Sequence, residues 1–341
     1  MTRPAPRAIG IAIIALLAAA AAAANVIRVN SPDRQFSDFV FAPPMPIRIF
    51  DRDGTLRMPF VYPLRLQSRL ERTFTEDRDH PMRLRFLSGG KLITVTDSRS
   101  PWFPLGTDAL GRDVFARLAT GSRLSLGVAF AAAAGALLIG ALAGAIAGLL
   151  GGRIDDVLMR VSEFILALPA LYVVLALRAA APLVLSTAQI FWIMVTVFAL
   201  VGWPFAARGV RAIVAAERTR EYAEAARSIG ASRTRLLLRH LLPATRGFLV
   251  VQATLLLPAF ILAEATLSFA GLGFGEPTPS WGVMLQEAGR GRTLADAPWL
   301  LAPAGAIAAL VFAVNLFTGA TVSAHSGLTS SDKPRVINDL S

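Results

Sequence analysis

The sequence predicts an all-α polytopic membrane protein of about six transmembrane helices, with a small β-rich exterior domain inserted after the first helix. The chain has 341 residues, of which 54% are hydrophobic and 17% charged, and its mean hydropathy is +0.55. These values are too apolar for a soluble domain of this length. The apolar residues are also gathered into separate runs that are long enough to cross a bilayer.

The first apolar run, residues 8–24 ("AIGIAIIALLAAAAAAA"), follows Arg3 and Arg7. At about 1.5 Å per residue it is just long enough to span the bilayer core. A basic start, an apolar middle and small residues at the end are also typical of a secretory signal peptide. We favour a retained transmembrane helix over residues 1–24, and the cleaved alternative stays open.

Residues 25–105 form a segment of different character, in which charges of both signs alternate with prolines and short β-type runs. The stretch "DRDGT" at 51–55 predicts a turn between two strands. The composition of residues 64–78 also allows a helical piece there. We therefore expect a small, water-exposed, β-rich domain.

The part of the chain that contains the remaining apolar runs, residues 106–320, begins with a predicted amphipathic helix over residues 106–123. Thr107 or Asp108 is the expected N-cap. An apolar helix over 124–150 follows, and small residues recur along it every four positions, which lets another helix approach closely. These small residues are Ala131, Gly135, Gly140, Gly144 and Gly148.

Four further spans and two polar segments complete the predicted organisation. The spans are residues 157–180 with an interruption at Pro169, 183–206 with Trp203 and Pro204 near the end, 247–270, and 299–320. A Gly/Pro-rich loop occupies residues 271–298, and a polar tail covers residues 321–341, which is expected to be cytoplasmic.

The arginines predict the orientation of the chain in the membrane. Residues 207–244 carry a large arginine excess, and short loops with such an excess stay on the cytoplasmic side. Residues 25–105 and 271–298 are then expected outside. The arginines of the loop are Arg208, Arg211, Arg218, Arg220, Arg227, Arg233, Arg235, Arg239 and Arg246, the last lying just past its end.

The basic loop reads as two short helices. The first is expected from Glu217 to Ile229, with small and apolar side chains on one face, and Gly230 can end it by supplying a left-handed turn. Ser232 can then cap a second helix over 233–242, which Pro243 is expected to stop. The expected face consists of Tyr222, Ala223, Ala226 and Ile229.

The sequence "EAARSIGASRTRLLLRHLLP" in this loop resembles the EAA loop of ABC importer permeases. The resemblance rests on Glu224-Ala225-Ala226, Gly230 and Leu242-Pro243. In that family the loop forms a coupling helix that seats in a groove of the cytoplasmic ATPase. The resemblance therefore implies an ATPase-coupling role for these six residues, with Glu224 capping the loop or pairing with a nearby arginine.

More of the chain resembles one branch of that family, the dipeptide, oligopeptide and nickel permeases of the "C" subunit type. The similar segments are "FAPPMP" (41–46), "GTDALGRDVFARLATGSRLSL" (106–126), "GGRIDDVLMRVSEFILALPAL" (151–171) and "AEATLSFAGLGFGEPTPSWGVML" (263–285). Because separate blocks occur in the right order, chance is a poor explanation. The end of the chain departs from the family, since Asn315-Leu316 is not followed by the usual closing motif.

The resemblance implies the type I permease fold of ABC importers in a bacterial inner membrane. The partners it implies are a second homologous permease, two cytoplasmic ABC ATPases and a periplasmic or lipid-anchored substrate-binding protein, beside membrane lipid and without nucleic acid. The chain itself would hold no cofactor, because ATP and Mg²⁺ belong to the ATPases. The substrate class it implies is peptides or related small solutes.

The residues agree that this chain is not an enzyme. Neither of its lysines, Lys91 and Lys333, is followed by the Ser or Thr that a P-loop requires. No cysteine is present, and His80, His240 and His325 lie far apart, so no metal site is expected.

Polar residues elsewhere are candidates for a gate or translocation path. Asp108, Arg112 and Asp113 fit either a contact with a binding protein or a plain Asp–Arg pair on an interfacial helix. Glu264 lies within a predicted span, where ionisable side chains usually face a cavity or a partner. The alternative function is a secondary transporter or channel that works without ATPases, although we find no internal repeat of the kind common in such folds.

Overall fold

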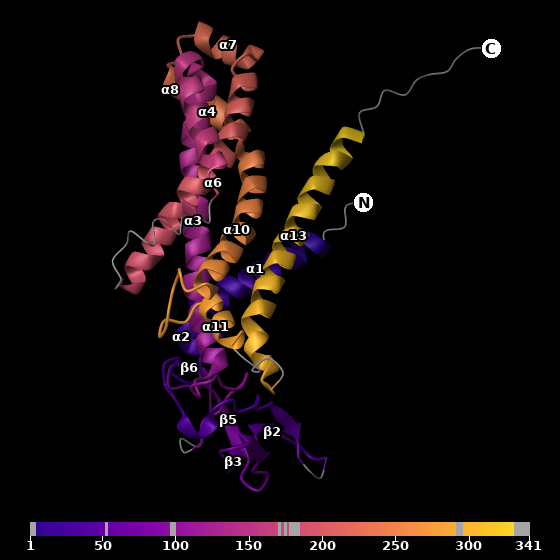
Figure 1. Ribbon diagram of the computed structural model, residues 1–341. Coiled ribbons are helices and arrows are strands. Elements are labelled where there is room, and N and C mark those ends of the chain that lie inside the picture. Colours follow the sequence, from indigo (N-terminus) through magenta and orange to yellow (C-terminus); the bar gives the residue numbers. More distant parts are fainter. Residues whose placement is uncertain are drawn as a thin grey trace, which may run out of the picture.

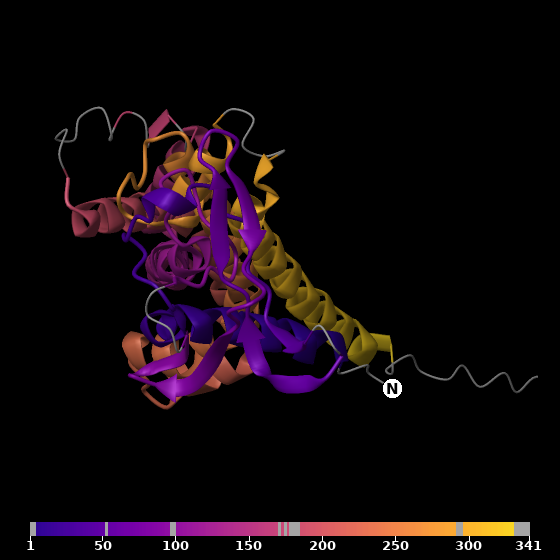
Figure 2. The same cartoon turned by 90° about the horizontal axis from the view of Figure 1, so that it is seen from below.

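The computed structural model describes residues 5–51, 54–95, 100–169, 172–173, 176, 185–290 and 296–330. Long helices run side by side, with a small β-sheet domain at one end and the short helices α7 and α8 at the other (Figure 1). Seen from below, the sheet domain lies in front of the helices and α13 projects to one side (Figure 2).

Four helices in the described part of the chain are long and apolar enough to cross a membrane. They are α3 (Val114–Leu150), α6 (Thr187–Glu217), α10 (Arg246–Phe269) and the stretch Pro298–Thr318, which contains the start of α13 (Ala302–Ser330). The helical membrane fold is therefore confirmed, whereas the expected number of six spans is not.

The N-terminal helix is one of the two expected spans that are not among these four. Helix α1 (Ala5–Ala22) has an apolar part, Ala8–Ala22, that is shorter than the other spans. It lies against α13 so closely that a Cβ on Gly10 would approach the Ala313 carbonyl oxygen to 2.6 Å. The short helix α2 (Ala24–Ile27) follows it.

The expected span over 157–180 is the other one. Helix α4 covers Gly152–Ala167, and most of the remaining stretch lies outside the described residues. The Arg211 guanidinium donates to both carboxylate oxygens of Asp155, at 2.6 and 2.5 Å, which ties α4 to α6. The segment at 151–156, read from sequence as a turn, is therefore already mostly helix.

The start of α3 differs from the prediction. The helix begins at Val114 and is continuous to Leu150, and its N-cap is Asp113 rather than Thr107 or Asp108. Gly111 has a φ of +69°, which interrupts a right-handed helix at that point. The Asp113 Oδ1 atom then accepts hydrogen bonds from the backbone amides of Phe115 and Ala116.

The prediction also ended the fourth span too early. Helix α6 continues through Pro204 to Glu217, so its last turns belong to the basic loop. Its N-terminus is a capping box, in which Ser186 and Gln189 bond reciprocally. Proline in a helix interior removes one hydrogen bond, but a helix packed on its neighbours tolerates that loss.

The glycine seam, formed by Gly140, Gly144 and Gly148, joins α3 to α6 as the sequence predicts. A Cβ on Gly144 would lie 2.3 Å from the Ala207 carbonyl oxygen, and one on Gly140 would lie 2.7 Å from the Trp203 carbonyl oxygen. The two backbones therefore approach at distances that no larger side chain allows.

The main apolar core lies where α3, α6 and α10 meet, with α1, α11 and α13 at its edge. Phe198 and Phe260 stack at its centre, with ring centroids 5.5 Å apart and planes at 9°. The loop after α10 contains a helix that the sequence analysis missed, α11 (Trp281–Ala288). Trp281 is buried and its Nε1 donates to the Leu118 carbonyl oxygen at 3.3 Å, so this tryptophan packs within the core.

The strands of the β-sheet domain lie between Arg48 and Val95, and its buried core also includes Val29, Trp102 and Phe103. It contains a four-stranded antiparallel sheet in the order β1-β2-β5-β6 and a separate hairpin of β3 and β4. The strands are β1 (Arg48–Phe50), β2 (Leu56–Val61), β3 (Leu64–Ser68), β4 (Thr73–Glu76), β5 (Met82–Ser88) and β6 (Lys91–Val95).

The hairpin overturns the helical reading of residues 64–78. Side chains alternate between half-buried and exposed along β3 and β4, which is the period of a strand. Strands β1 and β2 pair on either side of the predicted turn, with Phe50 opposite Leu56.

The last helix ends later than the sequence predicted. Helix α13 continues to Ser330, so the expected tail over 321–341 begins as helix. Residues 331–341 lie outside the described part of the chain.

We expect Gly144→Ala to destabilise the protein, because the new methyl group would force α3 away from the α6 backbone. Overpacking of this kind costs about 1–3 kcal/mol. Thermal unfolding in detergent measures the effect. The matched control is Gly247→Ala in α10, where nothing lies within 4 Å of the added Cβ. Equal melting temperatures for the two variants would contradict a tight α3–α6 contact.

Candidate functional site

The basic loop at the α7 end of the molecule is built around one left-handed glycine. Helix α7 runs from Glu221 to Ser228, and Gly230 follows with a φ of +84°. The Gly230 amide donates to the Arg227 carbonyl oxygen at 2.9 Å, and the Ala231 amide donates to the Ala226 carbonyl oxygen at 3.0 Å. This pair of bonds is the Schellman motif, so Gly230 ends α7 as predicted.

The two faces of α7 differ in burial. Ala223 and Ala226 are buried in a small cluster with Val210 and Val214 of α6. Tyr222 and Ile229, expected on that same face, are exposed instead. Tyr222 precedes Ala223 by one residue, which directs its side chain about 100° around the helix from that of Ala223. Ile229 lies after the last residue of α7. Neither side chain therefore packs against α6. The loop thus buries its small residues and presents its large ones.

The second half of the loop is a composite helix. Ser232 caps α8 (Arg233–Leu236) through the Arg235 amide, as predicted. A π-helical turn, η2 (Leu237–Leu241), and α9 (Leu242–Ala244) continue the same rod. Pro243 therefore does not stop the helix, because it lies in the first turn of α9, where a missing amide hydrogen is tolerated.

The predicted motif residues occupy different positions in this loop. Ala226 is buried, Leu242 and Pro243 are half-buried, and Glu224, Ala225 and Gly230 are exposed. The expected ion pair of Glu224 is wrong, since within the described ranges no arginine lies within 4.0 Å of its carboxylate.

Two arginines that the sequence analysis did not single out tie the loop down instead. The Arg218 Nη1 donates to the Leu149 carbonyl oxygen of α3 at 3.1 Å, and the Arg227 Nη2 donates to the Arg218 carbonyl oxygen. Only their place in an arginine-rich segment hinted at this role.

The five-residue charge cluster, made of Asp108, Arg112, Arg117, Glu276 and Glu287, lies at the sheet end of α3. The Arg112 guanidinium donates to Asp108 at 2.7 Å, to Glu276 at 2.6 Å and to Glu287 at 2.6 Å. Arg117 donates to Glu276 at 2.9 Å and to Glu287 at 3.2 Å. The side chains of Arg112 and Arg117 are only 3% and 0% exposed, so these contacts are shielded from water.

Sequence reasoning found only the Asp108–Arg112 pair of this cluster. The two glutamates lie far from Arg117 in the sequence. Glu276 is 159 residues from Arg117, and Glu287 is 170 residues from it. Asp113 stands next to the cluster and has another task, since it caps α3 and accepts from the Asn30 side chain at 2.8 Å.

Glu264 lies in α10 and is completely buried. Its Oε1 atom accepts a hydrogen bond from the Ser268 hydroxyl at 2.9 Å, and its Oε2 atom has no hydrogen-bond partner among the described residues. It faces the interior of this one chain, and a role in the translocation path stays a prediction.

Comparison with known proteins identifies the architecture. Residues 140–324 match the family described as "Binding-protein-dependent transport system inner membrane component". This stretch contains α6, α10, α11 and the whole basic loop. The chain belongs to this family. It is accordingly a multi-pass permease component of the cytoplasmic membrane.

Relatives in bacteria agree with this assignment. The oligopeptide transport system permease protein OppC of Bacillus subtilis (strain 168) is 38% identical over 220 residues, which are 64% of this chain and 69% of that protein. The dipeptide transport system permease protein DppC of the same organism is 41% identical over 239 residues, 68% of this chain and 72% of that protein. OppC of Escherichia coli (strain K12) is 38% identical over 211 residues, 62% of this chain and 67% of that protein.

In this permease the charge cluster has unequal numbers of basic and acidic groups. Two guanidinium groups face three carboxyl groups, so the charges balance when one carboxyl is protonated. Burial raises the pKa of Glu287 to about 8, and the adjacent Glu276 carboxyl adds to the rise. Burial also acts on Glu276, but the hydrogen bonds from Glu287 and Arg112 and the charges of both arginines outweigh it and lower its pKa to about 2.

We expect the stability of the permease to fall between pH 6 and pH 8. The folded state keeps the Glu287 proton up to a pKa of about 8, whereas the unfolded carboxyl releases it near 4.5. The stabilisation is complete below the unfolded pKa, declines as the pH rises above it, and is lost once the pH passes the folded pKa. The part of this decline that falls between pH 6 and pH 8 amounts to about 2 kcal/mol. Glu287→Gln should flatten the dependence.

Melting temperatures measured at several pH values test this expectation. The control is Glu163→Gln, because the Glu163 side chain is 64% exposed. Titrating groups other than the substituted glutamate are common to the compared proteins, so their effect cancels. Parallel pH profiles for the wild type and Glu287→Gln would show that the cluster holds no proton of this kind.

Proposed function

We propose that this permease is one of two membrane subunits of an ATP-driven importer of peptides or related small solutes, and that its 207–244 loop is the contact for the ATPases. The observation that carries the proposal is the difference between the two faces of this loop, one buried against α6 and the other exposed. Ala223 and Ala226 anchor it from below, while Tyr222, Ile229 and Leu238 face outward as exposed apolar side chains. Exposed aromatic and aliphatic anchors of this kind suit the centre of a protein interface.

The anchoring of the loop supports a mechanical role. Arg218 links it to the end of α3, and the glycine seam links α3 to α6 along its length. A load applied to α7 therefore reaches two membrane helices at once. Helix α6, with 31 residues, is about 46 Å long at 1.5 Å per residue, so a small tilt at the loop becomes a larger displacement at its far end.

Partner subunits complete this mechanism. The ATPases bind ATP and Mg²⁺ and hydrolyse the nucleotide, since the sequence of this chain has no P-loop. A second homologous permease supplies the other half of the path, and a substrate-binding protein delivers the solute on the exterior side. The names of the relatives, oligopeptide and dipeptide permeases, support a peptide as the substrate.

An apolar groove between α10 and α13 supports the proposal that the second permease packs against this face. Its volume is about 670 Å³, and its lining is almost entirely apolar. Among the residues that line it are Leu262, Phe269, Ile307, Val311 and Phe312. In an importer, such a face is covered by the matching helices of the other subunit.

The competing function is a transporter or channel that works without ATPases. Such a protein would have no use for a loop that exposes large apolar residues to the cytoplasm. Reconstitution separates the two functions, because an importer subunit needs a second permease and ATPases for transport. Transport by the chain alone in liposomes would establish the competing function.

We expect Ile229→Asp to abolish co-purification of the ATPases with the tagged permease, because a carboxylate would be desolvated at the interface. The residue is 87% exposed, so the substitution should not disturb folding. The matched control is Leu87→Asp, at a position that is 81% exposed in the sheet domain at the opposite end. ATPase recovery that is equal for both variants would remove the loop from the interface.

We expect Gly230→Pro to uncouple ATP hydrolysis from transport in the reconstituted complex. Proline cannot adopt a φ of +84° and has no amide hydrogen for the bond to Arg227. Gly230→Asn is the control, because asparagine tolerates the left-handed conformation. Transport and ATPase assembly that both survive Gly230→Pro would contradict the coupling role of this turn.

A further inference from the structure

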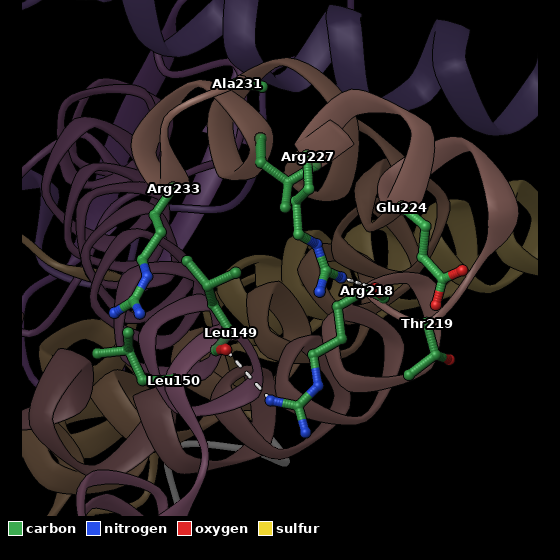
Figure 3. Close-up of a pocket in the computed structure, with 9 residues that line it drawn as sticks. Leu149, Leu150, Arg218, Thr219, Glu224, Arg227, Ala231 and Arg233 are labelled. Carbon is green, nitrogen blue, oxygen red and sulfur yellow. Dashed lines mark hydrogen bonds between the residues drawn. The ribbon is translucent and has the colours of Figure 1, made fainter. Parts of the chain in front are cut away.

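A cavity lies under the basic loop, on the side that faces the membrane helices. It measures about 460 Å³ and is bounded by the last residues of α3, the end of α6, and the helices α7 and α8. Figure 3 shows the side chains that line it, with Arg218, Arg227 and Arg233 directed toward the space beside Leu149 and Leu150.

The charge of this cavity is unbalanced. Three guanidinium groups and one carboxylate, that of Glu224, line it, so its formal charge is +2. Arg218 and Arg227 each use one donor on a backbone carbonyl oxygen, and Arg233 has no hydrogen-bond or ion-pair partner among the described residues. A guanidinium has five N–H donors, so most of the donors remain free for an anion. Guanidinium groups bind phosphate oxygens in pairs.

An apolar stripe on α3 leads into the cavity. Leu138, Leu142, Ile146 and Leu150 are all exposed, and their spacing of four places them on one face of the helix. This face is turned away from the glycine seam, whose residues fall about half a turn from it. The stripe ends at Leu150, which is itself part of the cavity lining.

We propose that this cavity binds the phosphate group of an anionic phospholipid, whose acyl chain lies along the stripe. The stripe belongs to a membrane-spanning helix and ends at the cavity, so a phosphate placed there has acyl chains beside it, which favours a lipid over a soluble phosphate. The arginine excess assigns this side to the cytoplasm, so the lipid comes from the inner leaflet. The proposal concerns a binding site of the permease itself and holds whichever solute the complex carries.

The site would brace the loop against the membrane. A phosphate between Arg218, Arg227 and Arg233 would add a link between the end of α6, α7 and α8, beside the Arg227–Arg218 hydrogen bond and the small apolar cluster that already join them. Anionic lipid would therefore stabilise the orientation of the loop.

Native mass spectrometry of the full-length permease in detergent tests the site, with phosphatidylglycerol and phosphatidylcholine as probes. We expect the wild type to retain phosphatidylglycerol in preference to phosphatidylcholine. Arg233→Gln should reduce that retention roughly fivefold, the effect of one basic residue near an anionic lipid. Arg233→Lys should keep most of it. The control is Arg235→Gln, which removes an exposed arginine of α8 that does not line the cavity.

The outcomes separate the proposal from its rivals. Equal retention of the two lipids, or an equal loss in Arg233→Gln and Arg235→Gln, overturns the site. A parallel titration with inorganic phosphate distinguishes the sources of the anion. Phosphate binding that depends on Arg233, without selective retention of phosphatidylglycerol, overturns the lipid in favour of a soluble anion. Because this assay needs no ATPase or substrate, it does not depend on the import proposal.

Discussion

The close packing of α3 on α6 is the constraint on which the rest of the molecule depends. Gly144 and Gly148 allow the backbone of α6 to lie against α3 without intervening side chains, and this contact fixes where both ends of the pair emerge. At one end α3 carries the charge cluster, and at the other its last carbonyl groups receive Arg218. A wider separation would break both sets of contacts.

The two ends of this helix pair use charge in different ways. The charge cluster near the sheet domain encloses its arginines among carboxyl groups and is nearly neutral, as buried ionic groups require. The loop end leaves its arginines in excess, with Arg233 unpaired within the described ranges. One end therefore holds segments of this chain together, while the other is suited to bind something that the chain does not supply.

Local signals in the sequence predicted the parts of this structure that local physics decides. Gly230 and Ser232 behave as a helix end and a helix start because a single residue determines each. The charge cluster could not be predicted, since Glu276 and Glu287 reach Arg117 only through the tertiary fold. Asp113 displaced Asp108 as the N-cap because Asp108 was already engaged by the amides of Leu110 and Arg112.

Pro204 has a mechanical consequence for α6. Having no amide hydrogen, it leaves the carbonyl oxygen of Leu200 without its usual helical donor, about midway along the helix. The rod therefore has a compliant point that divides it into an inner and an outer segment. The glycine seam contacts the inner segment, from Trp203 onward, more closely than Gly127 and Gly135 of α3 contact the outer one. A push from the loop would therefore turn the inner half first and bend the helix at its middle. The two segments of α6, before and after Pro204, could then tilt by different angles.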